Sequence, residues 1–351
     1  MVYIGKYSDI LSQILFKQQN CNVLLLTGKS SFIPYKSSFE QILKGIKYIH
    51  YDDFSTNPNV EDVNKALTAI KDDYDVIIAI GGGSVIDFAK LLKHYRQNND
   101  SIKIMAIPTT AGTGAEATKF AVLYINGEKS SIEDLKLLPN DSILDSELVR
   151  YAPRYLKACS ALDAFCQGIE SFWSNKSNSE SLRYAEKAIV LSKNNIEKFV
   201  NSDDYESANN MLQAAHFSGK AINISKTTAA HAVSYQLTSK YNIPHGHAVS
   251  FSIVNNFIYN QRVSDNDVND RRGGLFVKNQ LKKLQELLEF DDPRVYFRKL
   301  FSSIGICVNH TKLGITNIKS VTEKVNQERL SNNPKKLSCE ELNAILINPD
   351  F

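Results

Sequence analysis

The sequence predicts an α/β domain with a Rossmann-like parallel sheet over residues 1–150, followed by an all-α domain over residues 151–351. Two glycine- and threonine-rich segments carry the first half of this prediction. They are Gly81–Lys90, which follows the apolar run DVIIAI, and Pro108–Glu116, which follows the apolar run Ile104–Ile107. Strand–turn–helix units of this kind build parallel sheets whose carboxyl edge suits a dinucleotide.

The first 150 residues alternate short apolar runs with helical patterns. Val23–Leu26 predicts a strand, and Val60–Ile70 predicts a helix after the turn Asn57-Pro58-Asn59. Further strands are expected at residues 75–80, 104–107 and 142–144. This succession favours a parallel sheet with helices on both faces.

From about Tyr151 the pattern changes to long helical stretches. Pro153 suits a helix start and places the domain boundary near residues 150–153. Helices are expected over residues 155–173, 179–199, 208–222 and 228–240. The polar, asparagine-rich segment Asn255–Gly274 predicts a long surface loop or a loosely packed connection.

Composition excludes several classes of protein. The 351 residues, 43% hydrophobic and 23% charged, are typical of a globular protein with two domains. A net charge of +3 is too small to suggest a nucleic-acid partner. No apolar stretch approaches the ~20 residues that span a bilayer. The five cysteines are scattered without a C-x-x-C motif, which indicates reduced thiols and a cytoplasmic protein.

The glycine triplet Gly81-Gly82-Gly83 is expected to form an anion site. It lies between a strand and the start of a helix, where free backbone N–H groups and the helix dipole attract a diphosphate. The spacing is not G-x-G-x-x-G, and a lone triplet is also compatible with a plain turn. The second loop at the same sheet edge makes a dinucleotide site the better interpretation.

A set of polar side chains in the second half predicts a metal site. His231, His245 and His247 fall within 17 residues, and His245 and His247 are expected in a loop after the helix that carries His231. Asp163 and Gln167 are four residues apart and share one helix face. One carboxylate, one amide oxygen and two imidazoles suit Fe²⁺ or Zn²⁺. The alternative is that Asp163 pairs locally and the histidines are ordinary core or surface residues.

These segments together resemble the iron-dependent (group III) alcohol dehydrogenases, whose relatives include glycerol dehydrogenase, maleylacetate reductase and dehydroquinate synthase. The resemblance rests on four motifs in the family's order and covers nearly the whole chain. They are the glycine triplet with Ser84 and Asp87, the P-T-T-x-G-T-G-x-E loop, the L-D-A-x-x-x-x-I-E helix and the H-x13-H-G segment. A narrower resemblance, in Ile169–Ser174 and Thr227–Ser250, is to the phosphonoacetaldehyde reductase branch.

The resemblance implies a role for each matching residue. The residues it assigns to NAD or NADP are Gly82, Gly83, Ser84 and Asp87 around the diphosphate, and Thr109, Thr110 and Thr113 near the nicotinamide. The residues it assigns to one divalent metal are Asp163, His231 and His245. It also implies a homodimer.

Two positions depart from the family's pattern. Gln167 stands where the family usually has a histidine ligand, so an amide oxygen, a harder donor, is expected as a weak fourth ligand. Tyr235 stands where the family's alcohol dehydrogenases carry another histidine. Tyr235 and His247 are candidates for a proton-relay or orienting role. The alternative for Tyr235 is packing with its hydroxyl at solvent.

The turn after the first strand bears on the choice between the two nicotinamide cofactors. Members of the family that prefer NAD tend to carry an aspartate there, whereas this chain has Gly28, Lys29 and Ser30. A lysine and a serine can receive a 2′-phosphate, so NADPH should be accepted. The alternative is a hydrophilic turn with no contact to the cofactor.

The expected reaction is NAD(P)H-dependent reduction of a small aldehyde in the cleft between the domains, and for the narrower branch it is phosphonoacetaldehyde to 2-hydroxyethylphosphonate. Lys226 and Lys129 are the candidate cations for a phosphonate, together with the helix N-terminus at Thr227 and Thr228. Both lysines are equally compatible with solvated surface charges.

Three other functions remain open. They are a general iron-type alcohol dehydrogenase, a lyase of the dehydroquinate synthase type that uses NAD without net turnover, and a nucleotide-binding protein that has lost its metal.

Overall fold

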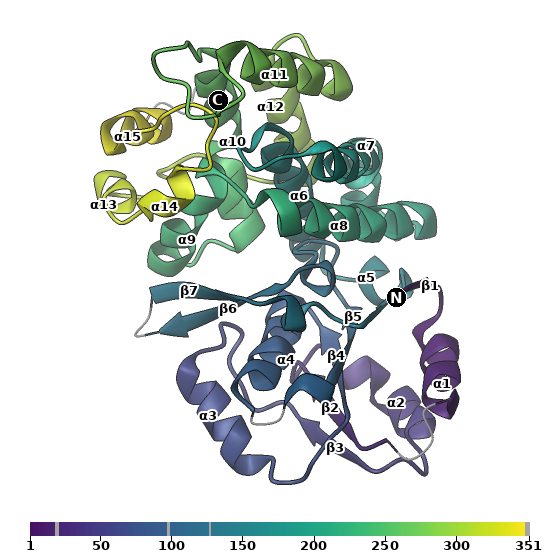
Figure 1. Ribbon diagram of the computed structural model, residues 1–351. Helices are drawn as coiled ribbons and strands as arrows, with labels where there is room; N and C mark the ends of the chain where they lie inside the picture. Colours follow the sequence, from purple (N-terminus) through teal and green to yellow (C-terminus); the bar gives the residue numbers. More distant parts are fainter. Residues whose placement is uncertain (18–20, 97–98, 126–127, 348–351) are drawn as a thin grey trace. The chain divides into compact units, whose positions relative to one another are not determined.

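The computed structural model describes residues 1–17, 21–96, 99–125 and 128–347 (Figure 1). The chain divides into two compact units, Met1–Ala152 and Pro153–Phe351. The first contains a parallel sheet with helices, and the second is rich in helices, so the predicted fold class is confirmed.

The first unit is built on a six-stranded sheet in the order β1-β8-β5-β4-β2-β3, and every pair of neighbouring strands is parallel. The strands are β1 (Val2–Ile4), β2 (Val23–Thr27), β3 (Tyr48–Tyr51), β4 (Val76–Gly81), β5 (Lys103–Pro108) and β8 (Asp141–Leu144). The apolar runs of β2 and β4 are buried at every position, as strands covered on both faces should be. A separate antiparallel hairpin, β6 (Phe120–Ile125) with β7 (Glu128–Glu133), was not expected from the sequence.

Helices cover both faces of the sheet (Figure 1). They are α1 (Tyr7–Lys17), α2 (Lys36–Ile42), α3 (Val60–Ala69), α4 (Gly83–Tyr95) and the short α5 (Glu147–Arg150). Side chains alternate across a strand. Leu24 therefore packs in one hydrophobic cluster with Phe88 of α4, whereas Leu25 packs in another with Leu11 of α1 and Phe39 of α2.

The two glycine- and threonine-rich loops begin side by side. Gly81 at the end of β4 pairs with Pro108 at the end of β5, and the N–H of Thr109 donates to the Gly81 carbonyl over 3.0 Å. Both loops therefore leave the same carboxyl edge of the sheet, as the sequence predicted.

In the described residues of the second unit, helices joined by loops are the regular elements, and the only β pairing is an isolated bridge between Val268 and Lys335. Its longer helices are α6 (Arg154–Trp173), α7 (Ser179–Asn201), α8 (Tyr205–Ser225), α9 (Ala229–Tyr241), α10 (His245–Gln261), α11 (Gly274–Leu288), α12 (Pro293–Ile304) and α15 (Cys339–Ile347). The short ones are α13 (Lys319–Thr322) and α14 (Gln327–Leu330). Nearly every residue of α6 is buried, because α7, α8 and α10 pack around it.

Two predictions for the second unit need correction. The asparagine-rich segment is only partly a connection, because α10 continues to Gln261 and residues 262–273 then lead to α11 at Gly274. Asn260 is fully buried and exchanges hydrogen bonds with the side chain of Asn333, so its amide serves the core rather than solvent. His245, Gly246 and His247 form the first turn of α10 instead of a loop. A Cβ at Gly246 would lie 1.9 Å from the Cys159 carbonyl oxygen, so glycine lets α10 approach α6.

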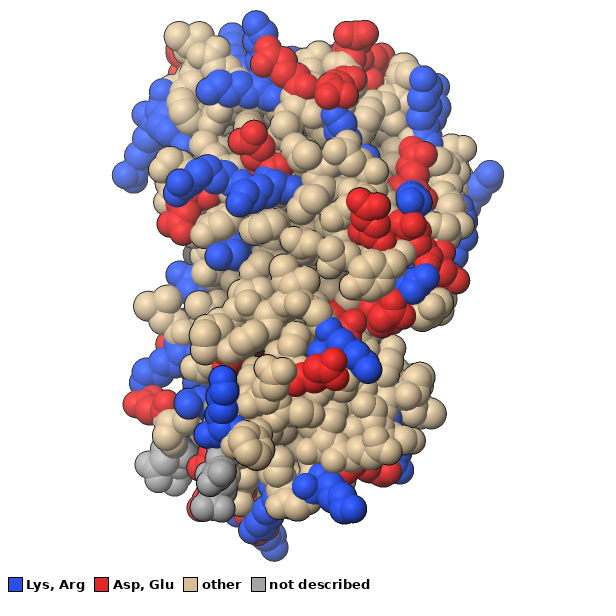
Figure 2. Space-filling model, turned by 90° about the vertical axis from the view of Figure 1, so that its right-hand side faces the viewer, with Lys and Arg blue, Asp and Glu red and all other residues tan. Residues whose placement is uncertain are grey.

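Charges of both signs are mixed on one face of the molecule (Figure 2). On the face shown in Figure 2, Lys and Arg side chains are interspersed with Asp and Glu side chains, in keeping with the net charge of +3. Among the described residues, no helix combines the length and apolar character that crossing a membrane requires.

A fully buried lysine ties α4 to the segment that follows the threonine loop. Lys90 Nζ donates to the carbonyl oxygens of Ala115 and Phe120, over 2.7 and 2.8 Å, and to Thr118 Oγ1 over 3.0 Å. The carboxylate of Asp87 lies 3.6 Å away. Burial lowers the pKa of Lys90, against the raising effect of the negative charges on Asp87 and Glu116. This network holds the threonine loop against the helix that begins at the glycine triplet.

We expect Lys90→Met to destabilise the first unit by about 3–5 kcal/mol, because it removes the cation beside Asp87 and the donor of three hydrogen bonds in a buried site. Urea unfolding would measure the loss. Lys71→Met, at an exposed lysine, is the control and should change the free energy of unfolding by less than about 0.5 kcal/mol. Equal stability of the two variants would contradict a structural role for Lys90.

Candidate active site

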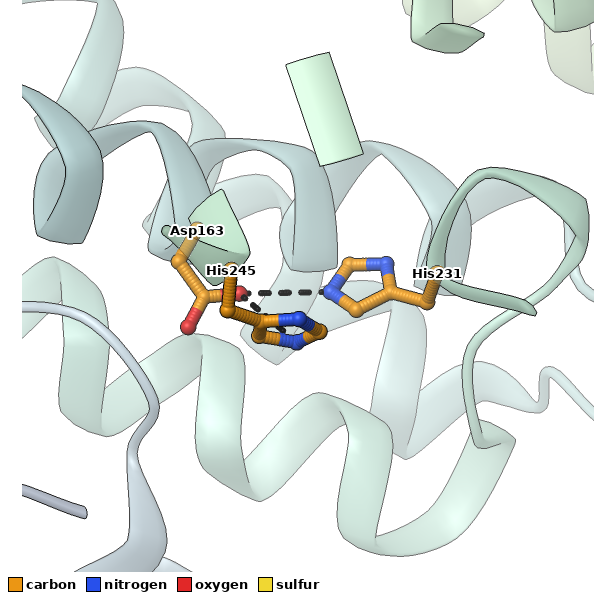
Figure 3. A group of neighbouring side chains, drawn as sticks. All are labelled: Asp163, His231 and His245. Atoms are coloured by element: carbon orange, nitrogen blue, oxygen red, sulfur yellow. Dashed lines mark hydrogen bonds and ion pairs between the residues drawn. The ribbon is translucent and has the colours of Figure 1, made fainter. Parts of the chain in front are cut away.

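Three helices bring together the residues predicted to bind metal. Asp163 lies on α6, His231 on α9 and His245 at the start of α10, and their ligand atoms all lie within 4.8 Å of one another (Figure 3). Asp163 Oδ1 is 3.3 Å from His231 Nε2 and 3.9 Å from His245 Nε2. Asp163 and His231 are buried and His245 is partly exposed, so the group is open on one side.

A buried glutamate that the sequence analysis left without a role orients His231. Glu170 Oε2 accepts a hydrogen bond from His231 Nδ1, and Oε1 accepts from Thr228 Oγ1 over 2.6 Å and from the Ala230 N–H over 2.8 Å. This contact fixes the proton on Nδ1 and turns Nε2 toward Asp163, as carboxylates behind metal-binding histidines do. Asp163, Gln167 and Glu170 follow the i, i+4, i+7 spacing of one helix face, a signal that was present in the sequence.

Electrostatics at His231 favour a positive charge in this site. Burial lowers the pKa of His231, but the carboxylates of Glu170 and Asp163 more than offset this effect and raise it to about 9. Without an ion, His231 therefore binds a proton between two carboxylates. A divalent ion would have to displace that proton.

Gln167 lies beside the group. Its Nε2 donates to Asp163 Oδ1 over 3.2 Å, and its Oε1 accepts from the hydroxyl of Ser218 over 2.8 Å. Both Gln167 and Ser218 are buried. The structure thus brings all four predicted metal residues together.

Tyr235 supports His245. The two rings are parallel within 2°, with centroids 5.6 Å apart, and Ser234 Oγ lies 3.1 Å from His245 Nδ1. The Tyr235 hydroxyl accepts a hydrogen bond from Arg329 Nη1 over 2.6 Å, so it does not end in solvent. Burial raises the pKa of Tyr235, against the lowering effect of Arg329. This phenol is placed to orient the His245 ring.

The structure does not bring His247 to the metal group. Its Nε2 lies 2.6 Å from the carbonyl oxygen of Cys307, which can only accept, so Nε2 carries a proton. Its Nδ1 then accepts from the Tyr155 hydroxyl over 2.8 Å. Burial lowers the pKa of His247, against the raising effect of the hydrogen bond to Cys307. Both ring nitrogens of this neutral histidine hold α10 in place, which argues against the expected relay role.

The expectation of an anion site at the start of α9 needs correction. Thr228 does not cap the helix with its side chain. Its hydroxyl instead donates to Glu170 and accepts from Trp173 Nε1 over 2.9 Å. The Ala230 N–H is also taken by Glu170. Lys226 is not in α9 but is the C-terminal cap of α8, with φ +60°. It remains three residues before the first residue of α9.

The predicted cofactor loops touch each other. Gly82 is the N-terminal cap of α4, and a Cβ there would lie 3.5 Å from the Thr110 side chain. A Cβ at Gly83 would lie 2.7 Å from Thr113 Oγ1, so only glycine allows this approach. The N–H groups at the start of α4 therefore lie beside threonine hydroxyls at the carboxyl edge of the sheet.

Ser84 and Asp87 have structural partners. The Ser84 hydroxyl donates to the Thr56 carbonyl, and Asp87 Oδ2 accepts from the Val122 N–H of the hairpin over 3.2 Å. Burial raises the pKa of Asp87, against the lowering effect of Lys90 and Lys129. Lys129, on β7, is thus a charge near Asp87 at the hairpin.

An aspartate that was not predicted from the sequence lies beside the turn Gly28-Lys29-Ser30. Asp53, two residues after β3, receives Lys29 Nζ over 3.0 Å and Lys65 Nζ over 2.5 Å. Hydrogen bonds from Lys65 and Lys29 lower the pKa of Asp53. Asp53 is distant in sequence from the turn Gly28-Lys29-Ser30, and the parallel pairing of β3 with β2 brings the two turns to the same edge of the sheet.

Two family models match consecutive parts of the chain. Iron-containing alcohol dehydrogenase matches residues 3–146, and Fe-containing alcohol dehydrogenase family, C-terminal, matches residues 157–348. Phosphonoacetaldehyde reductase of Streptomyces viridochromogenes is 31% identical, with 84% of this chain and 81% of that protein covered. Alcohol dehydrogenase 4 of Schizosaccharomyces pombe is 32% identical over 56% of this chain and 51%, about half, of that protein.

Solved structures share the fold. The crystal structure of sulfoacetaldehyde reductase from Bifidobacterium kashiwanohense in complex with NAD⁺ has a TM-score of 0.85. The similarity covers 99% of this chain and 96% of that chain at 24% identity.

We expect Glu170→Gln to weaken Zn²⁺ binding by about 10–100-fold, because a neutral amide no longer holds the His231 proton on Nδ1 with a full charge. Competition with a chromogenic chelator would measure the affinity. Glu116→Gln, at another buried glutamate on the first unit, is the matched control and should leave it unchanged. An unaltered Zn²⁺ affinity in Glu170→Gln would contradict the orienting role.

Proposed function

The chain belongs to the iron-containing alcohol dehydrogenase family, and within it we propose that the protein reduces a small phosphonate-bearing aldehyde to the alcohol with NADPH or NADH. The observation that carries the proposal is the convergence of Asp163, His231 and His245 with a buried carboxylate behind His231. The best-supported substrate is phosphonoacetaldehyde, because the reductase of that compound is similar to this chain over most of its length.

The donor set fits a divalent metal. Two imidazoles and one carboxylate suit Fe²⁺ or Zn²⁺, and Gln167 is the candidate for a fourth ligand. A bound ion would act as a Lewis acid on the carbonyl oxygen. The residues of the chain hold and orient the donors, since Glu170 fixes the His231 tautomer and Tyr235 fixes the His245 ring.

The first unit fits a dinucleotide. The N–H groups of Gly83 and Ser84 at the start of α4 would bind the diphosphate, and Thr109, Thr110 and Thr113 would line the nicotinamide end. Hydride transfer is the chemistry of the cofactor, which the protein orients.

Lys29 and Lys65 favour acceptance of NADPH. Two lysines share the single carboxylate of Asp53, so the cluster carries a net positive charge that suits a 2′-phosphate. Asp53 can instead accept a hydrogen bond from a ribose 2′-hydroxyl, which lets NADH bind too.

Lys226 is the proposed cation for the phosphonate. It lies at the end of α8, directly before the helix that carries His231. A phosphonate carries up to two negative charges near neutral pH, and a charge-assisted contact discriminates it from an uncharged substituent. The N–H of Ala230 is occupied by Glu170, so the proposed contact is the Lys226 side chain rather than this N–H group.

For the cofactor, we expect native enzyme to turn over with NADPH and Gly28→Asp to lower its preference for NADPH over NADH by about tenfold or more, since a carboxylate would repel the 2′-phosphate. The ratio of kcat/KM values for the two cofactors measures the shift. Gly28→Ala is the matched control, because it adds the same Cβ, 2.5 Å from Ser31 Oγ, without charge. Native activity with NADH and none with NADPH would show that the turn does not receive a phosphate.

For the substrate, kcat/KM for phosphonoacetaldehyde should greatly exceed that for propanal, and Lys226→Ala should reduce the advantage by a few kcal/mol, the order of a charge-assisted contact. Lys220→Ala is the control, because it removes another lysine of α8, whose ammonium lies over the ring of Tyr184 on α7. Equal rates on both aldehydes would indicate a general alcohol dehydrogenase. Cofactor binding without net NAD(P)H consumption on any aldehyde would favour the lyase-like alternative.

A further inference from the structure

Ser218, on α8, has a buried hydroxyl with two oxygen neighbours. Its Oγ lies 2.8 Å from the carbonyl oxygen of Ala215 and 2.8 Å from Oε1 of Gln167 on α6. At the other end of the same amide, Gln167 Nε2 lies 3.2 Å from Asp163 Oδ1. The amide of Gln167 therefore connects Ser218 to the oxygen that faces both His231 and His245.

In this orientation of the Gln167 amide, the single hydroxyl proton of Ser218 cannot serve both oxygen neighbours. A hydroxyl has one proton to donate, and the two oxygens beside it, from Ala215 and Gln167, are both carbonyl acceptors. One of the two oxygen–oxygen contacts is therefore without a proton. Turning the amide by 180° lets Gln167 Nε2 donate to Ser218 and lets Ser218 donate to Ala215. Each contact of the hydroxyl then has its proton.

At the Asp163 end, the same 180° rotation of the Gln167 amide is unfavourable. It places Gln167 Oε1 beside Asp163 Oδ1, and two acceptor oxygens repel each other unless a cation lies near both. Without an ion, the amide is therefore held with Nε2 on Asp163. With a divalent ion among Asp163, His231 and His245, the turned amide is favoured at both ends.

We propose that Ser218 is a positioning residue for the metal: it donates to the Gln167 oxygen when no ion is bound and accepts from the Gln167 amide nitrogen when an ion binds, which turns the amide oxygen toward the ion. The proposal rests on the metal-dependent function proposed above. It explains how glutamine serves where the family usually has a histidine ligand, because a hydroxyl behind the amide stabilises the coordinating orientation.

The test uses Co²⁺ as the probe, with affinity from chelator competition and ligand geometry from visible absorption. Ser218→Ala and Gln167→Leu should each weaken Co²⁺ binding by about tenfold or more and change the spectrum in the same way. The double variant should bind no more weakly than Gln167→Leu, because both changes remove one ligand. Ser218→Thr, which keeps the hydroxyl, should retain the native affinity and spectrum. Ser225→Ala is the matched control, since Ser225 is also buried on α8 and also bonds a serine of α6.

Unchanged Co²⁺ binding in Ser218→Ala, or penalties that add in the double variant, would overturn the proposal while leaving the metal site intact. A native spectrum in Gln167→Leu would do the same, because Gln167 would then not be a ligand. Absence of Co²⁺, Zn²⁺ and Fe²⁺ binding in the native protein would overturn the proposed function itself and this inference with it.

Discussion

The contact between Glu170 and His231 is the interaction on which the site depends. A carboxylate with no solvent contact is unfavourable unless it is fully hydrogen-bonded. Glu170 meets this condition by binding His231, Thr228 and the Ala230 N–H, so it joins α6 to the first turn of α9. These hydrogen bonds set the orientation of the His231 ring.

The need to hydrogen-bond buried polar groups and to pack the helices closely explains which residue types surround the site. Thr228 accepts from Trp173 while it donates to Glu170, so its hydroxyl joins α6 to the start of α9, and it does not cap α9. Gly246 allows α10 to lie close to α6, so His245 reaches Asp163 from the first turn of a helix. Small and polar residues in this region therefore allow close helix packing rather than forming loops.

Local patterns predicted the elements whose physical cause is local. The apolar runs before Gly81 and Pro108 are buried on both faces, and such runs are read directly from sequence. The candidate metal ligands could be predicted to lie together because Asp163 and Gln167 share one turn of a helix and the histidines cluster in the sequence. Asp53 and the role of Glu170 were missed because their partners, Lys29 and His231, lie on other elements. Asn260 suggested a loop because its buried partner, Asn333, is distant in sequence.

The origin of the three donors on three separate helices has a thermodynamic consequence. An ion bound by Asp163, His231 and His245 cross-links α6, α9 and α10, and it binds the folded arrangement far better than the unfolded chain. Folding equilibrium of the second unit then becomes linked to the free concentration of the ion, by about 1.4 kcal/mol for each tenfold rise above the dissociation constant. Metal supply would thus govern how long this half of the protein survives cellular proteolysis, independently of turnover.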